Sequence, residues 1–154
     1  MNVEYINPFI EASQSVWTMM TGNKPVLGKV YLKNVPYHSE DIVVIVGLTG
    51  KIRGQVVISM NTNTALKVAS SMMGGAMVAE LDEMSKSAIS ELGNMIMGNT
   101  ATILAGRGIG IEITPPSILI GEKMVITPAN MKTICVPLLL EGDAPIEINV
   151  SLEE

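Results

Sequence analysis

Glu91 and Asn94 are the residues whose types and spacing point to chemistry. They stand three positions apart, so in a helix their side chains are neighbours on one surface. A carboxylate can pair with a cation, and an amide can donate and accept hydrogen bonds at the same time. The pair is therefore a candidate site for catalysis or for binding a partner. Ordinary solvated positions are the alternative, because a Glu and an Asn at this spacing occur in many helices.

The segment of residues 82–106 must position this pair, and its hydrophobic pattern predicts an amphipathic helix. At about 100° per residue, the side expected to be buried consists of Ser85, Ile89, Leu92, Ile96 and Ile103. The opposite side carries Ser87, Glu91, Asn94 and Gly98. Glycine inside a helix lowers its stability by roughly 1 kcal/mol relative to alanine. Because the segment contains both Gly93 and Gly98, we expect another group to approach it closely.

Length and composition predict one domain, residues 1–154, with a substantial core. The chain has 154 residues, of which 47% are hydrophobic and 16% are charged. Its net charge of −5 and its lack of a Lys/Arg cluster argue against nucleic-acid binding, which needs cations to neutralise phosphates. The twelve methionines are interpreted as core filling, with a flexible recognition surface as the alternative.

Signals for targeting and for metal binding are weak. The N-terminus has neither the basic start nor the apolar core of a signal peptide, and the longest apolar run, residues 42–46, is too short to cross a bilayer. We therefore expect a soluble, cytoplasmic protein without membrane contact. Cys135 is expected to be a reduced, buried thiol, which suits the cytosol. His38 has no second His or Cys near it, so no metal site is predicted.

A first helix is predicted near the N-terminus. Asn7 is a candidate N-cap with Pro8 at the first helical position, and Gly22 is expected to end the helix. This helix carries Glu11 and Gln14 at the same spacing as the pair described above. Because Gln is one methylene longer than Asn, its amide would be placed differently.

Strands dominate the rest of both halves of the chain. Three strands in residues 26–60 read as an antiparallel meander, and further strands are predicted in residues 109–152. Between them lies a helix capped by Asn61 or Asn63 and stopped at Gly74. The predicted fold class is therefore α+β, a single domain with a sheet packed against long helices. A weak internal duplication, in which each half is a helix followed by antiparallel strands, is also predicted.

Several runs of residues, in their order and spacing, are similar to one known family. They are Ala-Leu-Lys-Val-Ala-Ser-Ser-Met-Met-Gly-Gly at 65–75, Leu-Asp-Glu at 81–83, Ala-Ile-Ser-Glu-Leu-Gly-Asn-Met at 88–95 and Ile-Thr-Pro-Pro-Ser at 113–117, with Gly-Leu-Thr-Gly at 47–50 and Gly54 upstream. Over nearly its whole length, the chain resembles the CheX members of the CheC/CheX/FliY phosphatases of bacterial chemotaxis.

The resemblance implies hydrolysis of the aspartyl phosphate on a CheY-type response regulator. The helix with Glu91 and Asn94 would dock across the regulator's active site, where Asn94 positions a water and Glu91 pairs with the regulator's lysine. Gly98 would give clearance beside them, and Ser87 would lie on the same docking face. The Mg²⁺ would belong to the regulator, so no cofactor of the chain's own is expected.

The resemblance also bears on the number of sites and on assembly. CheC-type members use two such helices and CheX-type members use one; because Gln14 departs from the Asn of the pattern, we expect one active site per chain. A homodimer with joined sheets is implied, with the strand Met131–Leu140 as a candidate edge. The alternative function is a non-catalytic module that binds a response regulator or the flagellar switch. The intact Glu91 and Asn94 favour the enzyme, because a pure binder has no need of the amide.

Overall fold

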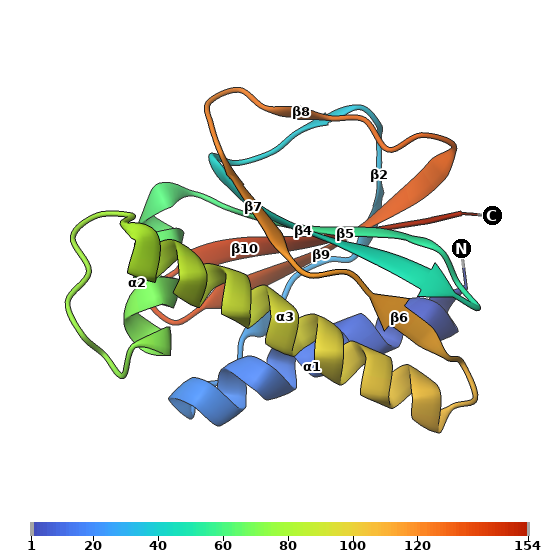
Figure 1. Ribbon diagram of the computed structural model, residues 1–154, viewed down its shortest axis with the longest axis horizontal. Helices are drawn as coiled ribbons and strands as arrows, with labels where there is room; N and C mark the ends of the chain where they lie inside the picture. The colour runs from blue at the N-terminus through green and yellow to red at the C-terminus, as the bar shows by residue number, and fades with distance from the viewer. Residues whose placement is uncertain (1, 154) are drawn as a thin grey trace.

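The protein consists of a β-sheet with helices packed on one of its faces (Figure 1). The computed structural model describes residues 2–153 of the chain. α1 (Val3–Thr21) and α3 (Glu83–Gly106) lie side by side, and α2 (Thr62–Met72) packs against α3 at one end of the sheet. A hydrophobic core fills the space between these helices and the sheet. The predicted α+β class is confirmed.

α1 begins five residues earlier than predicted. Its N-cap is Asn2, whose side-chain oxygen accepts a hydrogen bond from the Glu4 N–H at 2.9 Å. Pro8 therefore lies inside the helix, and the predicted cap at Asn7 is wrong. The reason is that Ile6 continues the buried stripe on the N-terminal side of Pro8, and packing of such a stripe contributes most of a helix's stability in a folded protein.

The other helix ends agree with their sequence signals. α1 ends at Gly22, which has a left-handed φ of 77°. α2 is capped by Asn61, whose side chain accepts a hydrogen bond from the Thr64 N–H at 2.8 Å. α3 is capped by Asp82 and begins at the next residue. Local cap chemistry therefore determined where these helices begin and end.

The buried stripe of α3 is close to the predicted one. Four of the residues expected inside are buried: Ser85, Ile89, Leu92 and Ile96. The prediction fails at Ile103, which is only half-buried, while Leu104 is fully buried. The stripe turns slightly around the helix through Met97 and Thr100, both of which are also fully buried.

Residues 2–153 contain ten strands, and all of their pairings are antiparallel. Their bounds are β1 Val26–Leu27, β2 Tyr31–Lys33, β3 Tyr37–His38, β4 Ile42–Gly50, β5 Gly54–Met60, β6 Ile111–Ile113, β7 Ser117–Ile120, β8 Val125–Ile126, β9 Met131–Leu140 and β10 Ala144–Glu153. The main sheet has the order β1-β9-β10-β5-β4-β6, with β2 also paired to β9 and β7 also paired to β4. β3 and β8 form a separate two-stranded ladder.

The two halves of the chain exchange their short strands. β1 and β2, from the first half, pair with β9, whereas β6 and β7, from the second half, pair with β4. β5 and β10 pair at the centre of the sheet, and β3 pairs with β8. Each half thus repeats a long helix, three short strands and a long hairpin. The predicted internal duplication is confirmed by this arrangement.

The predicted meander of residues 26–60 is wrong in its first strand. β4 and β5 form the expected antiparallel hairpin, with Val44 opposite Ile58. β2 pairs instead with β9 of the other half, where Leu32 lies opposite Ile134. Apolar and β-branched residues predict that a segment is a strand, but they carry little information about which strand lies beside it.

β9 is not the free edge that the sequence suggests. One side of β9 pairs with β10, and the other side pairs with β1 and β2, with Leu27 opposite Leu138 and Tyr31 opposite Cys135. Between these ladders the Gly28 N–H donates a hydrogen bond to the Pro137 carbonyl oxygen at 2.9 Å. The candidate dimer edge is therefore covered within the chain, and the homodimer itself stays a prediction.

Candidate active site

Glu91 and Asn94 lie on the exposed side of α3, opposite its buried stripe. They line a shallow groove of about 330 Å³ between α3 and the beginning of β7. The groove is lined by Glu83, Lys86, Ser87, Ser90, Glu91, Asn94, Pro116 and Ile118. The predicted residues Ser87, Glu91 and Asn94 are thus brought together, whereas the predicted Gly98 does not line the groove.

The functional groups of the central pair are unengaged. Across residues 2–153, neither the Glu91 carboxylate nor the Asn94 amide has a hydrogen-bond or ion-pair partner. Both side chains are exposed, so their hydrogen-bonding capacity faces solvent. In a rigid helix the two groups are therefore presented together to whatever occupies the groove.

Gly93, between the two site residues, sets how closely α3 lies on the sheet. A Cβ at this position would lie 2.9 Å from Val44 Cγ1 and 3.7 Å from Ile58 Cδ1, on the central strands β4 and β5. The close approach expected at this glycine is thus made by the chain's own sheet. At Gly98 a Cβ would meet nothing within 4 Å, so this side of α3 stays open.

The wall opposite α3 was not foreseen from the sequence. Pro116 and Ile118 come from the segment that enters β7, and β7 reaches the groove only because it pairs with β4 of the other half. The adjacent Pro115 and Pro116 indicate that a strand is interrupted there, but nothing in the sequence indicates that this segment lies beside α3. Lys86, also missed, forms an exposed ion pair with Glu83 at 3.2 Å; such pairs contribute little to stability.

The start of α3 is held by hydrogen bonds around its cap. Asp82 Oδ1 accepts hydrogen bonds from the Ser85 hydroxyl at 2.6 Å and from the Ser85 N–H at 2.9 Å. These hydrogen bonds, that of the hydroxyl first, hold the pKa of the Asp82 carboxyl below its usual value. The first turn of α3, which carries the groove residues Glu83 and Lys86, is thereby held in one geometry.

α1 carries a related but different groove, of about 430 Å³. It is lined by Glu11, Gln14, Ser15, Thr18, Met19 and Lys24. Unlike the pair on α3, both polar groups here are engaged: Gln14 Nε2 donates to the Pro25 carbonyl oxygen at 3.3 Å, and Glu11 Oε2 accepts from Arg107 Nη2 at 3.4 Å. This difference is in keeping with one active site per chain, which stays a prediction.

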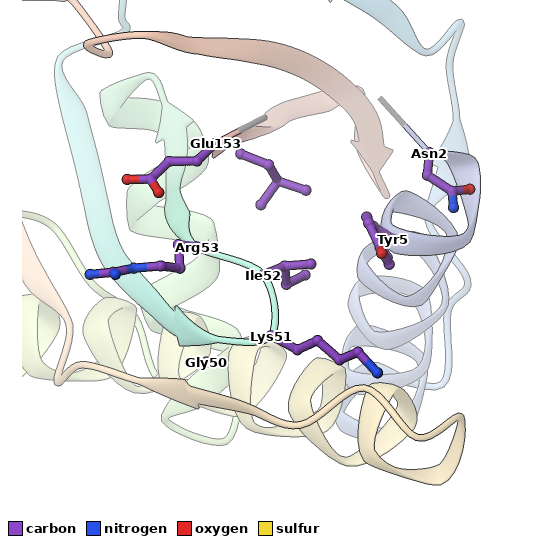
Figure 2. A pocket seen from close by; sticks show the side chains of 8 residues that line it. Asn2, Tyr5, Gly50, Lys51, Ile52, Arg53 and Glu153 are labelled. Carbon is purple, nitrogen blue, oxygen red and sulfur yellow. The ribbon is translucent and has the colours of Figure 1, made fainter.

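A further hollow of about 460 Å³ lies at the turn between β4 and β5, beside the start of α1 (Figure 2). It is lined by Asn2, Tyr5, Gly50, Lys51, Ile52, Arg53, Leu152 and Glu153. Figure 2 shows Lys51 extending toward α1 while Arg53 and Glu153 lie on the other side of the hollow. It shares no residue with the groove of Glu91 and Asn94, so it is a separate surface.

A cluster of titratable groups lies on the face of the sheet away from the helices. Glu147 Oε2 accepts hydrogen bonds from Lys33 Nζ at 3.0 Å and from Cys135 Sγ at 2.9 Å, and Lys33 Nζ also donates to Asn149 Oδ1 at 3.1 Å. Burial and the Glu147 carboxylate raise the pKa of Cys135 to about 12. The thiol is therefore protonated and unreactive at neutral pH. As predicted, it is buried and free of a disulfide.

Within residues 2–153, no three His, Cys, Asp or Glu side chains are grouped so that they could hold a metal ion. None of the helices in that range combines the length and the apolar character needed to span a bilayer.

Known proteins are similar to this chain in both sequence and fold. A family model described as chemotaxis phosphatase CheX matches residues 42–139. The CheY-P phosphatase CheX of Thermotoga maritima is 31% identical over 153 residues, which cover 99% of this chain and 98% of that protein.

Two solved structures extend the similarity to three dimensions. The match from a CheX–CheY–BeF₃–Mg²⁺ complex of Borrelia burgdorferi is 33% identical, with a TM-score of 0.82 over 99% of this chain and 100% of that chain. The chemotaxis protein CheX of Desulfovibrio desulfuricans is 26% identical, with a TM-score of 0.86 over 97% and 99% of the two chains. With a family model covering more than half of its residues, the chain belongs to the CheX family of chemotaxis phosphatases.

Proposed function

We propose that this protein hydrolyses the aspartyl phosphate of a CheY-type response regulator, with Asn94 positioning the attacking water and Glu91 recognising the regulator. One observation carries the assignment of these residues. Glu91 and Asn94 project, unengaged, from the exposed side of a helix that Gly93 seats directly on the sheet. The relatives support the reaction, since one is a CheY-P phosphatase and another forms a complex with CheY, BeF₃ and Mg²⁺.

Hydrolysis of an aspartyl phosphate requires mainly that a water molecule be correctly positioned. Water attacks phosphorus in line, the bond between phosphorus and the aspartate oxygen breaks, and inorganic phosphate leaves with the regulator's carboxylate restored. Catalysis of phosphoryl transfer is mostly positioning together with stabilisation of charge. The Asn94 amide suits the first task because its oxygen can accept a hydrogen bond from the water while its nitrogen donates another. A carboxylate there would instead add negative charge beside the phosphoryl group.

Glu91 suits recognition. Residues at this spacing on a helix have their Cβ atoms about 5–6 Å apart, so both can reach into one active site. The Glu91 carboxylate is free to pair with a cation of the regulator, such as its active-site lysine. Ser87 extends the same exposed side, and the open surface at Gly98 gives the regulator room to approach. The Mg²⁺ is assigned to the regulator, and this chain contributes no ligand to it.

We expect a cytoplasmic location, where a CheY-type response regulator would be found. A single buried, free cysteine, Cys135, supports it, because reduced thiols are typical of cytosolic proteins. Fractionation of the producing cells, followed by detection of the protein in the soluble fraction, tests the location.

Phosphate release from a purified regulator tests the function. The regulator is drawn from the CheY-type proteins of the same genome and is phosphorylated with acetyl phosphate and Mg²⁺. Asn94→Ala is expected to lower the accelerated rate about 100-fold, which is the scale seen when one positioned group of an active site is removed. The same variant is expected to bind the BeF₃-loaded regulator as the parent does, whereas Glu91→Ala is expected to bind it more weakly.

Gln14→Ala is the matched control, since it removes an amide from the related groove of α1. It is expected to leave the rate of phosphate release unchanged. If Asn94→Ala released phosphate as fast as the parent protein, the proposed mechanism would be wrong. A parent protein that binds the loaded regulator without accelerating hydrolysis would point to the non-catalytic module instead.

A further inference from the structure

Two methionines beside the proposed active site face solvent. Met77 is 97% exposed and Met84 is 69% exposed, so the interpretation of the methionines as core filling is wrong for both. Met19, on α1, is a third exception with 74% exposure. Exposed methionine is a flexible, polarisable apolar side chain, and it is common on adaptable binding surfaces.

Met84 lies on the same side of α3 as the active-site pair. It precedes Glu91 by seven residues, which is two helical turns with a rotation of only about 20°. The rise between the two residues is about 10 Å. The exposed side of α3 therefore runs from an apolar end at Met84, through Ser87, to Glu91 and Asn94.

Met77 belongs to the loop of residues 73–82, which joins α2 to α3 and stands out from the body of the protein (Figure 1). Both ends of this loop are held by hydrogen bonds: the Gly75 N–H donates to the Ser70 carbonyl oxygen at 2.8 Å, and the Asp82 side chain accepts from the Ser85 N–H at 2.9 Å.

The loop also has apolar anchors. Val78 and Leu81 are partly buried against the core, while Met77 points away from it. The exposure of Met77 is thus a consequence of how the loop is held. Met77 and Met84 line one shared hollow of about 620 Å³.

A specific complex with the regulator needs more contact area than the groove of Glu91 and Asn94 offers. Stable interfaces bury about 800 Å² on each partner, from about 20–30 residues. The groove of Glu91 and Asn94 is lined by eight residues, several of them charged, so a regulator docked on it must reach further. Toward the N-terminal end of α3, the next exposed surface is formed by Met84 and Met77.

We propose that Met77 and Met84, the methionine patch, form a second, apolar part of the docking surface and contact an apolar area on the same response regulator, outside its phosphorylated active site. This proposal rests on the proposed function. Met84 lies two turns from Glu91 and almost three turns, about 15 Å, from Asn94, so the patch supplies no group to the reaction. It therefore adds to the affinity for the regulator that Glu91 provides, while Asn94 sets the rate of hydrolysis.

Steady-state hydrolysis of the acetyl-phosphate-treated regulator separates these two roles. The double variant Met77→Ser/Met84→Ser is expected to raise KM about tenfold, which corresponds to about 1.4 kcal/mol of binding free energy. Its kcat is expected to stay within twofold of the parent value. The variant Met77→Leu/Met84→Leu keeps the apolar surface and is expected to keep KM. Met19→Ser removes an equally exposed methionine from α1 and is the matched control, with KM unchanged.

Binding of the regulator loaded with BeF₃ and Mg²⁺, measured by calorimetry, is expected to show the same tenfold loss for the serine double variant. An unchanged KM in that variant, or an equal rise with Met19→Ser, overturns the proposal. A change in oligomeric state with KM unchanged would also overturn it, by assigning the patch to a second copy of the chain. Failure of the proposed function is seen separately, as an active Asn94→Ala variant.

Discussion

Replacing Gly93 by alanine places one methyl group between the helix that carries the active site and the sheet beneath it. The new Cβ would lie 2.9 Å from Val44 Cγ1, whereas carbon atoms in favourable contact are about 3.5 Å or more apart. Helix and sheet must therefore separate locally by about 0.6 Å, or Val44 must leave its rotamer. Because Val44 is fully buried, its surroundings offer no room for that movement.

The expected magnitude follows from two opposing effects. Inserting an extra carbon into a well-packed core costs about 1–3 kcal/mol. Replacing glycine by alanine inside a helix stabilises it by about 1 kcal/mol. Gly93→Ala is therefore expected to change the free energy of unfolding by between about 0 and −2 kcal/mol. Gly98→Ala, where nothing lies within 4 Å, has the helix effect alone and is expected to stabilise the fold by about 1 kcal/mol.

Urea unfolding of the two variants measures this contact directly. Since the helix effect is common to both, the difference between their unfolding free energies, about 1–3 kcal/mol, isolates the overpacking. In a Val44→Ala background the penalty of Gly93→Ala is expected to disappear, because the clashing methyl is gone. The reasoning is refuted if Gly93→Ala is as stabilising as Gly98→Ala, or if the penalty persists without the Val44 side chain.

The same pair of variants connects packing to activity. Gly93 lies between Glu91 and Asn94, so a displaced helix moves both side chains relative to a docked regulator. Displacements of 1 Å can lower catalytic rates about 100-fold. We therefore expect a lower kcat for Gly93→Ala. Gly98→Ala is expected to keep kcat and to raise KM if the glycine gives clearance to the regulator.

Two further predictions concern the cluster on the other face of the sheet. Because burial and Glu147 raise the pKa of Cys135 to about 12, a thiol reagent at pH 8 is expected to label no cysteine in the native protein and one after unfolding in urea. For Glu147, burial acts to raise the pKa, but hydrogen bonds from Cys135 and Lys33 lower it below its usual value. The native pKa thus lies below that of the unfolded chain, so the carboxylate stabilises the fold above about pH 4.3 and this contribution is lost as the pH falls through the native pKa. Glu147→Gln is expected to flatten the loss of stability as the pH falls below about 4.3, measured by urea unfolding; an unchanged pH profile would contradict this.

Local signals in the sequence were enough for most helix ends and for the orientation of the candidate site. Asn61 and Gly22 marked helix ends because capping depends on neighbouring residues in the chain. The periodicity of α3 placed Glu91 and Asn94 opposite the buried stripe, because in a helix sequence spacing determines the face. The same reasoning failed at Asn7, since Pro8 is a strong local signal that packing of Ile6 overrides.

The pairing of strands could not be read in this way. The exchange by which β2 joins β9 and β7 joins β4 depends on contacts between residues far apart in the chain. The edge predicted at β9 was wrong for the same reason. The exchange also brings Pro116 and Ile118 beside α3, so the second wall of the groove was missed although all of its residues were visible.

The sequence by itself therefore determined that one helix presents a carboxylate and an amide on a single face, since this depends only on helical geometry. The tertiary structure decided what surrounds that pair. It seated Gly93 on the sheet, closed the groove with a strand from the exchanged ladder, and left Met77 and Met84 in solvent. Burial and neighbourhood depend on the packing of distant segments, and no local pattern encodes which segments these are.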